Sequence, residues 1–160
     1  MVQVEVSGII HAPKEKVYAT QVAFQNWPKI FPWVKSVRLV SEQGNERVIE
    51  SVLIPKEGKK KERVFRNIQR FVSPNQIDEF QRPISIMDGL PIMMRFSFET
   101  VPDGTRILIT VSLGGPNVKY NFLFKAAAFL FRERIGAGLD EAFQRSLELK
   151  KKYIESGEQS

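Results

Sequence analysis

The sequence predicts an α+β domain in which seven antiparallel strands precede a long C-terminal helix. Segments with a strand-like alternation of apolar and polar residues follow one another up to residue 113, and short turns such as Gly44-Asn45 and Pro102-Asp103-Gly104 join them. Strands joined by such short turns pair in antiparallel fashion. The seven expected strands are Val2 to His11, Val34 to Glu42, Glu46 to Ile54, Arg63 to Val72, Gln76 to Gln81, Ile92 to Val101 and Thr105 to Leu113.

Two short helices are expected between the first two strands. Pro13 suits the first turn of a helix, because its missing N–H would have no partner there, and Glu15 meets the positive end of the helix dipole. Trp27-Pro28 and Pro32 interrupt the helical pattern. The two helices are therefore expected to join at Trp27-Pro28.

A change to helical spacing after Pro116 predicts the long C-terminal helix. From Leu139 onward, apolar side chains recur with the period of a helix and form one stripe toward the sheet, and the lysines 150–152 are expected off this stripe. Residues 121–131 are apolar on more than one side, and Gly136 and Gly138 predict a bend between the two parts. The apolar part is either a deeply buried helix or a mobile lid over a cavity.

Length and composition indicate one domain over residues 1–160, with a polar tail from about residue 156. The chain has no cysteine, which excludes a disulfide scaffold, a thiolate zinc site and a cysteine nucleophile. The N-terminus reads as a strand rather than a signal peptide, and no stretch reaches the roughly 18 apolar residues of a membrane span. A cytoplasmic protein is therefore expected.

The segment from Ala12 to Val40 resembles the START-like (SRPBCC) superfamily, which includes polyketide cyclase/dehydrase proteins, coenzyme Q-binding proteins and pollen-allergen relatives. The matching positions are the strand Val2 to His11, Ala12-Pro13, Val17-Tyr18, the segment Trp27 to Trp33, and Val34 to Val40. This resemblance implies a helix-grip fold, in which a curved sheet wraps around the C-terminal helix and encloses a hydrophobic cavity. The superfamily includes carriers, cyclases and interaction modules, so the fold alone does not define the function.

Aromatic and aliphatic side chains on the expected strands could line such a cavity. Met94, Phe96 and Phe98 share one face of a strand, and Ile109 has the same register on the next strand. A solid core would use the same side chains, so a filled and a hollow interior both remain possible at this point. The candidate ligand-binding residues are Phe31, Trp33, Val37, Glu50, Val52, Phe65, Phe80, Met87, Leu90, Met94, Phe96, Phe98, Ile109, Phe122, Phe124 and Leu130.

Charged residues within the expected strands are the candidates for chemistry. Alternation places Glu50, Arg66 and Arg70 on the same face as neighbouring valines and isoleucine, so these charges would face the cleft and Glu50 would pair with Arg66. The alternative is that the valines face solvent and the charges lie on the surface. In aromatase/cyclase relatives an arginine on a comparable strand polarises substrate carbonyls, which makes Arg66, Arg70 and a tyrosine such as Tyr120 the catalytic candidates.

The usual catalytic and metal-binding patterns do not occur in the sequence. His11 is the only histidine, and at the end of a strand it is expected to close an edge rather than act as a base. Asp78 and Glu79 are adjacent, so their side chains point in different directions. No HxxxH or HExxH motif, cysteine pair or glycine-rich phosphate loop occurs, so no metal or cofactor is expected.

A net charge of +6 raises the question of an anionic partner. No nucleic-acid-binding motif occurs and no aromatics are interleaved with the basic run, so sequence-specific DNA binding is not expected. The hairpin tip that carries this basic run is either exposed to solvent without a partner, or it binds an anionic membrane surface or ribosomal RNA. The basic run comprises Lys56, Lys59, Lys60, Lys61 and Arg63.

Three functions follow as hypotheses. The first is binding or transport of a hydrophobic molecule such as a lipid, an isoprenoid quinone or a polycyclic aromatic. The second is a polyketide aromatase/cyclase-like enzyme. The third is an interaction module that uses the basic hairpin.

Overall fold

A computed structural model describes residues 2–85, 89–114 and 122–157. Its elements follow the expected order and form one antiparallel sheet in the order β1-β7-β6-β5-β4-β3-β2. The α+β helix-grip prediction is confirmed. The strands are β1 (Gln3–Ile10), β2 (Val34–Gln43), β3 (Glu46–Leu53), β4 (Arg63–Ser73), β5 (Gln76–Pro83), β6 (Ile92–Val101) and β7 (Gly104–Leu113).

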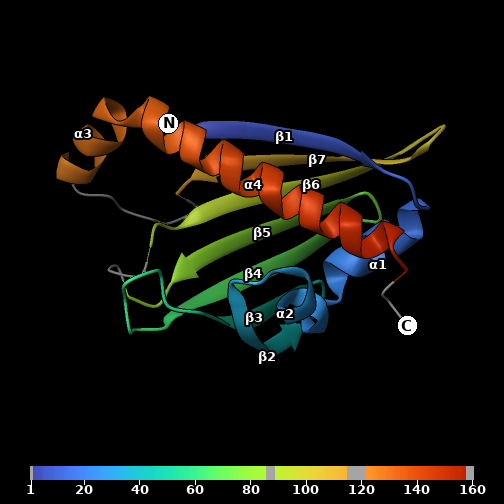
Figure 1. Cartoon of the computed structure of the whole chain (residues 1–160), viewed down its shortest axis with the longest axis horizontal. Helices are drawn as coiled ribbons and strands as arrows, with labels where there is room; N and C mark the ends of the chain where they lie inside the picture. The colour runs from blue at the N-terminus through green and yellow to red at the C-terminus, as the bar shows by residue number, and fades with distance from the viewer. Residues whose placement is uncertain (1, 86–88, 115–121, 158–160) are drawn as a thin grey trace.

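The helices lie on one side of the sheet (Figure 1). The long helix α4 (Arg132–Glu155) crosses the inner face of the curved sheet, α1 (Lys14–Val22) and α2 (Trp27–Ile30) lie near its C-terminal end, and α3 (Phe122–Leu130) lies at the opposite end. A 3₁₀ turn, Phe24–Asn26, joins α1 to α2. Pro28 lies in the first turn of α2, where a backbone N–H is not required.

Alternate residues of each strand point to the inner face and form the core. On β3 every second residue is buried, namely Arg47, Ile49, Ser51 and Leu53. The residues between them lie on the outer face, so a shift of one residue would reverse the two faces of the strand. The inner face thus contains polar side chains as well as the apolar core.

A close approach between β1 and α4 holds the long helix against the sheet. A Cβ atom built on Gly8 would lie 2.8 Å from Leu147 Cδ2, so only glycine allows this contact without a shift of the leucine. Leu147, Tyr153 and Ile154 are buried on the same part of α4. This contact fixes the helix over one half of the sheet.

The apolar segment before α4 differs from the prediction in two ways, namely where the helix breaks and how far the segment is buried. The helix breaks at Phe131, whereas Gly136 and Gly138 lie within α4. The helix α3 has no buried residue, and Phe122 and Leu130 are 82% and 74% exposed. The deeply buried helix is therefore a wrong prediction: α3 extends past the end of the sheet and only Phe124 and Ala128 pack against the core. No helix of the described ranges is long and apolar enough to span a membrane.

Candidate functional site

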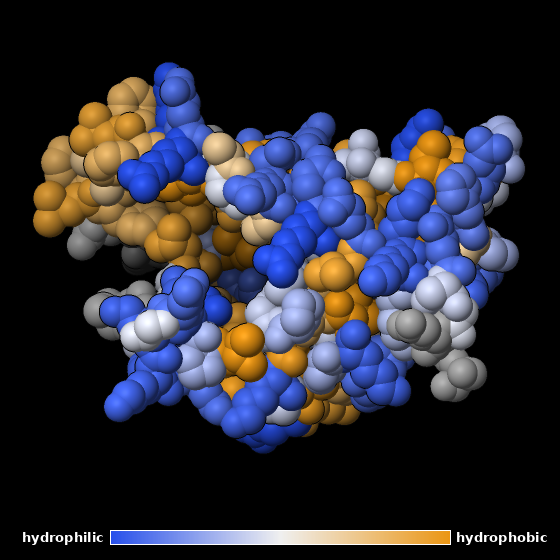
Figure 2. Space-filling model, viewed as in Figure 1, coloured by the Kyte–Doolittle hydropathy of each residue, from blue (hydrophilic) through white to orange (hydrophobic). Residues whose placement is uncertain are grey.

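A cavity of about 520 Å³ lies between the inner face of the sheet and α4. The space-filling view shows a hollow below α4, with apolar side chains on its walls (Figure 2). Its walls come from α1, α2, the strands β2 to β7 and the apolar stripe of α4, which contributes Ile135, Leu139, Ala142 and Phe143. Both tryptophans of the chain, Trp27 and Trp33, are among the lining residues. A volume of this size lies within the usual range for small-molecule sites.

The structure places about a third of the predicted ligand-binding residues on the cavity wall. Three others face inward without lining the cavity: Phe98 and Ile109 belong to the buried core, and Val37 is partly buried against it. The Phe98 ring packs edge-on against the Tyr18 ring, with 5.3 Å between the ring centroids. Met87 and the catalytic candidate Tyr120 lie outside the described residues. The predicted residues that line the cavity are Phe31, Trp33, Phe65, Leu90, Met94 and Phe96.

Six further candidates lie elsewhere. Phe122 and Leu130 are exposed on α3, and Phe124 packs against the core without lining the cavity. Glu50, Val52 and Phe80 lie on the outer face of the sheet, because their neighbours in each strand occupy the inner positions. The structure therefore corrects the expected positions of all six.

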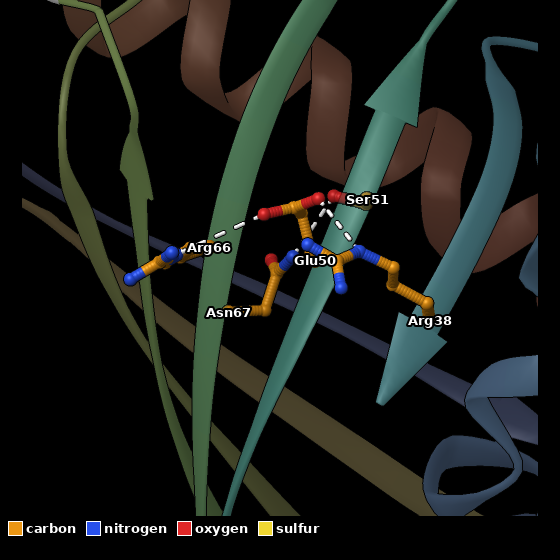
Figure 3. A network of polar contacts seen from close by, with 5 residues as sticks. All are labelled: Arg38, Glu50, Ser51, Arg66 and Asn67. Atoms are coloured by element: carbon orange, nitrogen blue, oxygen red, sulfur yellow. Dashed lines mark hydrogen bonds and ion pairs between the residues drawn. The ribbon is translucent and has the colours of Figure 1, made fainter. Parts of the chain in front are cut away.

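The catalytic candidates Arg66 and Arg70 also lie on the outer face, which corrects the expectation that they face the cleft. Asn67 and Gln69 hold the inner positions of the same strand. The expected pairing of Glu50 with Arg66 is confirmed, with Arg66 Nε 3.9 Å from Glu50 Oε2, while Arg38 Nε donates to Glu50 Oε1 at 2.9 Å (Figure 3). The side chains of Arg38 and Arg66 are 66% and 40% exposed, while that of Glu50 is 14% exposed. Solvent screens the arginines, so the network contributes about 1 kcal/mol or less to stability.

A chain of buried polar side chains crosses three strands on the inner face. Arg47 Nε donates to Gln69 Oε1 at 2.9 Å, and Gln69 Nε2 donates to Glu79 Oε2 at 2.7 Å. The guanidinium of Arg47 also donates to the Val22 carbonyl at the end of α1 and lies between the rings of Phe24 and Phe71. Burial raises the pKa of the Glu79 carboxyl, although the hydrogen bond from Gln69 and the charges of Lys150 and Arg47 oppose this shift.

Lys150 brings a buried amine to the cavity wall. It donates from Nζ to Gln21 Oε1 at 2.6 Å, and Nζ lies 4.6 Å from the centroid of the Phe96 ring. Burial lowers the pKa of Lys150 to about 8, and the charge of Glu79 opposes this shift. The amine is therefore mainly protonated at neutral pH and can recognise an anionic or carbonyl oxygen.

Asn67 and Ser51 form a second polar group on the wall. Asn67 Nδ2 donates to Ser51 Oγ at 2.9 Å, while Asn67 Oδ1 is buried without a hydrogen-bond partner among the described residues (Figure 3). An unpaired buried carbonyl costs free energy unless a partner reaches it. A bound molecule with a hydroxyl group would supply that partner.

Sequence reasoning missed these polar residues for two reasons. On β3 and β4 both faces carry alternating apolar residues, and the prediction from the sequence places the valines inside. Lys150 was expected off the apolar stripe, but it stands four residues after Ser146 and three after Leu147 and belongs to the stripe. That spacing is the signal which could have identified it. Across the described ranges, no group of three His, Asp or Glu side chains is placed to hold a metal ion.

A curved antiparallel sheet, a long helix across its inner face and a cavity between them define a helix-grip protein of the START-like class. The family model described as polyketide cyclase/dehydrase and lipid transport matches residues 1–148. The chain therefore belongs to this family.

Solved structures with the same fold include proteins of several kinds. A protein from Thermus thermophilus superposes with a TM-score of 0.72 at 17% identity, over 99% of both chains. The Zhui aromatase/cyclase from Streptomyces superposes with a TM-score of 0.71 at 14% identity, over 96% of this chain and 93% of that one. A START superfamily protein from Mycobacterium smegmatis gives 0.72 at 15% identity, over 96% and 97%. At these identities the likeness shows the fold alone, and no curated protein sequence matches the chain.

Proposed function

We propose that this protein binds a hydrophobic small molecule with one polar, oxygen-bearing end in the cavity between the sheet and α4. The observation that carries the proposal is the Lys150 amine, which is buried on the wall of an otherwise largely apolar cavity. Lipids, isoprenoid quinones and polycyclic aromatics with a hydroxyl, carbonyl or carboxylate group have this chemistry. The family's description, which includes lipid transport, supports the same class of ligand.

The arrangement of the cavity gives the ligand a direction. The aromatic side chains Phe31, Phe65 and Phe96 would contact the apolar body, and their burial against it would supply most of the binding free energy. Lys150 would donate to the polar end, and Asn67 Oδ1 would accept from a hydroxyl group. The polar groups would therefore fix orientation and specificity rather than overall affinity.

Two measurements test this proposal. Organic extraction of the purified protein followed by mass spectrometry should identify a co-purified hydrophobic molecule with an oxygen-bearing end. Titration of the delipidated protein with hexadecanoic acid or a hydroxylated naphthoquinone should change the tryptophan fluorescence, because Trp27 and Trp33 line the cavity. An empty extract together with no fluorescence change for either probe would contradict the proposal.

An aromatase/cyclase-like activity is the second candidate, and the low pKa of the Lys150 amine favours it. In such a reaction a base removes a proton from the carbon beside a carbonyl, the carbanion attacks a second carbonyl of the same chain, and water leaves as the ring becomes aromatic. Above about pH 8, where the amine is mainly neutral, Lys150 would take the first proton. A linear β-polyketone incubated with the protein should then yield an aromatic chromophore, and Lys150→Met should abolish its formation whereas Arg66→Ala should not.

A further inference from the structure

The large exposed hydrophobic side chains gather at one end of the molecule. Of the eleven in the described ranges, eight lie at this end, and Leu39, Val40 and Val72 lie elsewhere. Figure 2 shows an apolar mass over α3 at this end. The eight are Ile54, Ile84, Leu90, Phe122, Leu123, Phe129, Leu130 and Phe131. We call residues 54–63, 84–85, 89–90 and 122–134 the mouth end, because Lys56, Arg63, Leu90 and Ile135 line the cavity on this side and the hollow in Figure 2 lies there.

The helix α3 has the composition of an element that needs an apolar partner. Its nine residues include one charge, Lys125, and none of its side chains is buried. A surface helix of a water-soluble protein normally presents a polar face to solvent, and this one does not. Exposed apolar surface of this kind marks an interaction site.

Positive charge surrounds this apolar surface. The segments 54–63 and 122–134 contain eight cationic and three acidic side chains. The cations are Lys56, Lys59, Lys60, Lys61, Arg63, Lys125, Arg132 and Arg134, and the acids are Glu57, Glu62 and Glu133. In Figure 2 hydrophilic residues lie beside the apolar mass and also on the opposite side of the hollow, below it. The surface therefore combines exposed phenylalanine and leucine with a net positive rim.

We propose that the mouth end docks on an anionic lipid bilayer, with α3 inserted at the level of the headgroups and acyl chains and the lysines of residues 56–61 on the headgroups. The apolar side chains would gain from insertion, and the cations would gain from the negative surface potential. The cavity would then open toward the membrane, so that a hydrophobic ligand could pass without crossing water.

The charge distribution favours a bilayer over other occupants. A second copy that covered α3 by two-fold symmetry would bring two positive rims together, which opposes association. A nucleic acid would satisfy the rim but would leave Phe122, Leu123 and Leu130 in water. An anionic bilayer satisfies both features at once.

Sedimentation with vesicles tests the proposal on the full chain. Wild-type protein should sediment with vesicles of equal parts phosphatidylcholine and phosphatidylglycerol, and weakly or not at all with phosphatidylcholine alone. The pair Phe129→Ser and Phe131→Ser should weaken binding by at least about tenfold, because two exposed rings are lost. The pair Lys59→Glu and Lys60→Glu should weaken it by a similar factor and reduce its sensitivity to salt.

Matched control variants keep the test specific. Leu39→Ser with Val72→Ser removes exposed apolar residues away from α3, and Lys16→Glu with Lys152→Glu reverses two exposed charges on α1 and α4. Both control pairs should bind vesicles as wild type does, and all variants should keep the wild-type melting temperature. Wild-type protein that stays in the supernatant overturns the proposal, and so does a phenylalanine pair that still binds. A dimer that the phenylalanine pair dissociates would also overturn it, because a second copy would then cover α3. These outcomes are independent of ligand binding in the cavity.

Discussion

Lys150 Nζ at the C-terminal half of α4 donates a hydrogen bond of 2.6 Å to Gln21 Oε1 of α1. The two residues are 129 positions apart and both line the cavity. This bond joins the long helix to the short helix and holds an amine beside the aromatic walls. The position of that amine underlies the proposed function, and its protonation can be followed experimentally.

Ligand affinity should depend on pH through Lys150. The pKa of Lys150 is about 8, so the amine loses its charge as the pH rises through this value. Affinity for hexadecanoate should therefore be constant from pH 6 to 7 and fall by up to about tenfold per pH unit above 8. Fluorescence titrations across this pH range measure the affinity. A plot of affinity against pH should show an inflection near pH 8 in the wild type and none in Lys150→Met. An inflection that persists in this variant would assign the dependence to another group.

Stability should depend on pH in the opposite direction. The pKa of Lys150 falls from 10.5 in the unfolded chain to about 8 in the folded one, so between these values the unfolded chain binds more protons. The free energy of unfolding of wild type relative to Lys150→Met should rise by up to about 1.4 kcal/mol per pH unit in this window. Below pH 8 the burial penalty is fully present and the difference should be flat. Urea unfolding of both proteins at pH 7, 8, 9 and 10 checks this, and a relative stability that falls with pH would contradict the burial of the amine.

Gly104 should tolerate no side chain. Its φ is 144°, and a Cβ atom there would lie 2.2 Å from the Ile10 carbonyl oxygen. Gly104→Ala should lower the free energy of unfolding by at least about 2 kcal/mol, because backbone has to move. Gly44→Ala is the matched control: its φ is 59° with no atom within 4 Å, so the cost should be about 1 kcal/mol. Equal losses in urea unfolding would show that the β1–β7 contact is looser than the structure indicates.

Replacing the arginines of the outer face should leave the cavity unaffected. Arg66 and Arg70 pair with Glu50 and Glu46 on the surface away from the cavity. Arg66→Ala and Arg70→Ala should each change the free energy of unfolding by less than about 1 kcal/mol and leave ligand affinity unchanged. Fluorescence titration beside Lys150→Met measures this. A loss of affinity in either arginine variant as large as in Lys150→Met would restore the sequence-based assignment.

The order of the strands, and their bounds to within two residues, could be predicted from the sequence, because turn residues such as Gly44 and Gly104 mark where hairpins reverse. Which residues of β3 and β4 face inward could not be predicted, because Val48 and Ile49 are both apolar and the alternation allows either of them to point toward the core. The polar cavity wall depends on contacts between distant segments, as in the pair Gln21 and Lys150. The exposure of Phe122 could not be predicted either, because an apolar helix is normally buried.

The most direct test of the account compares two ligands that share a chain and differ at one end. Hexadecanoic acid carries a charged end and its methyl ester does not, so only the acid should depend on the charge of Lys150. At pH 7, Lys150→Met should weaken binding of the acid at least about tenfold more than binding of the ester, while Lys152→Met on the exposed face of the same helix should change neither. Equal losses for acid and ester in Lys150→Met, or no loss for either, would contradict the claim that the cavity holds the polar end of its ligand against Lys150.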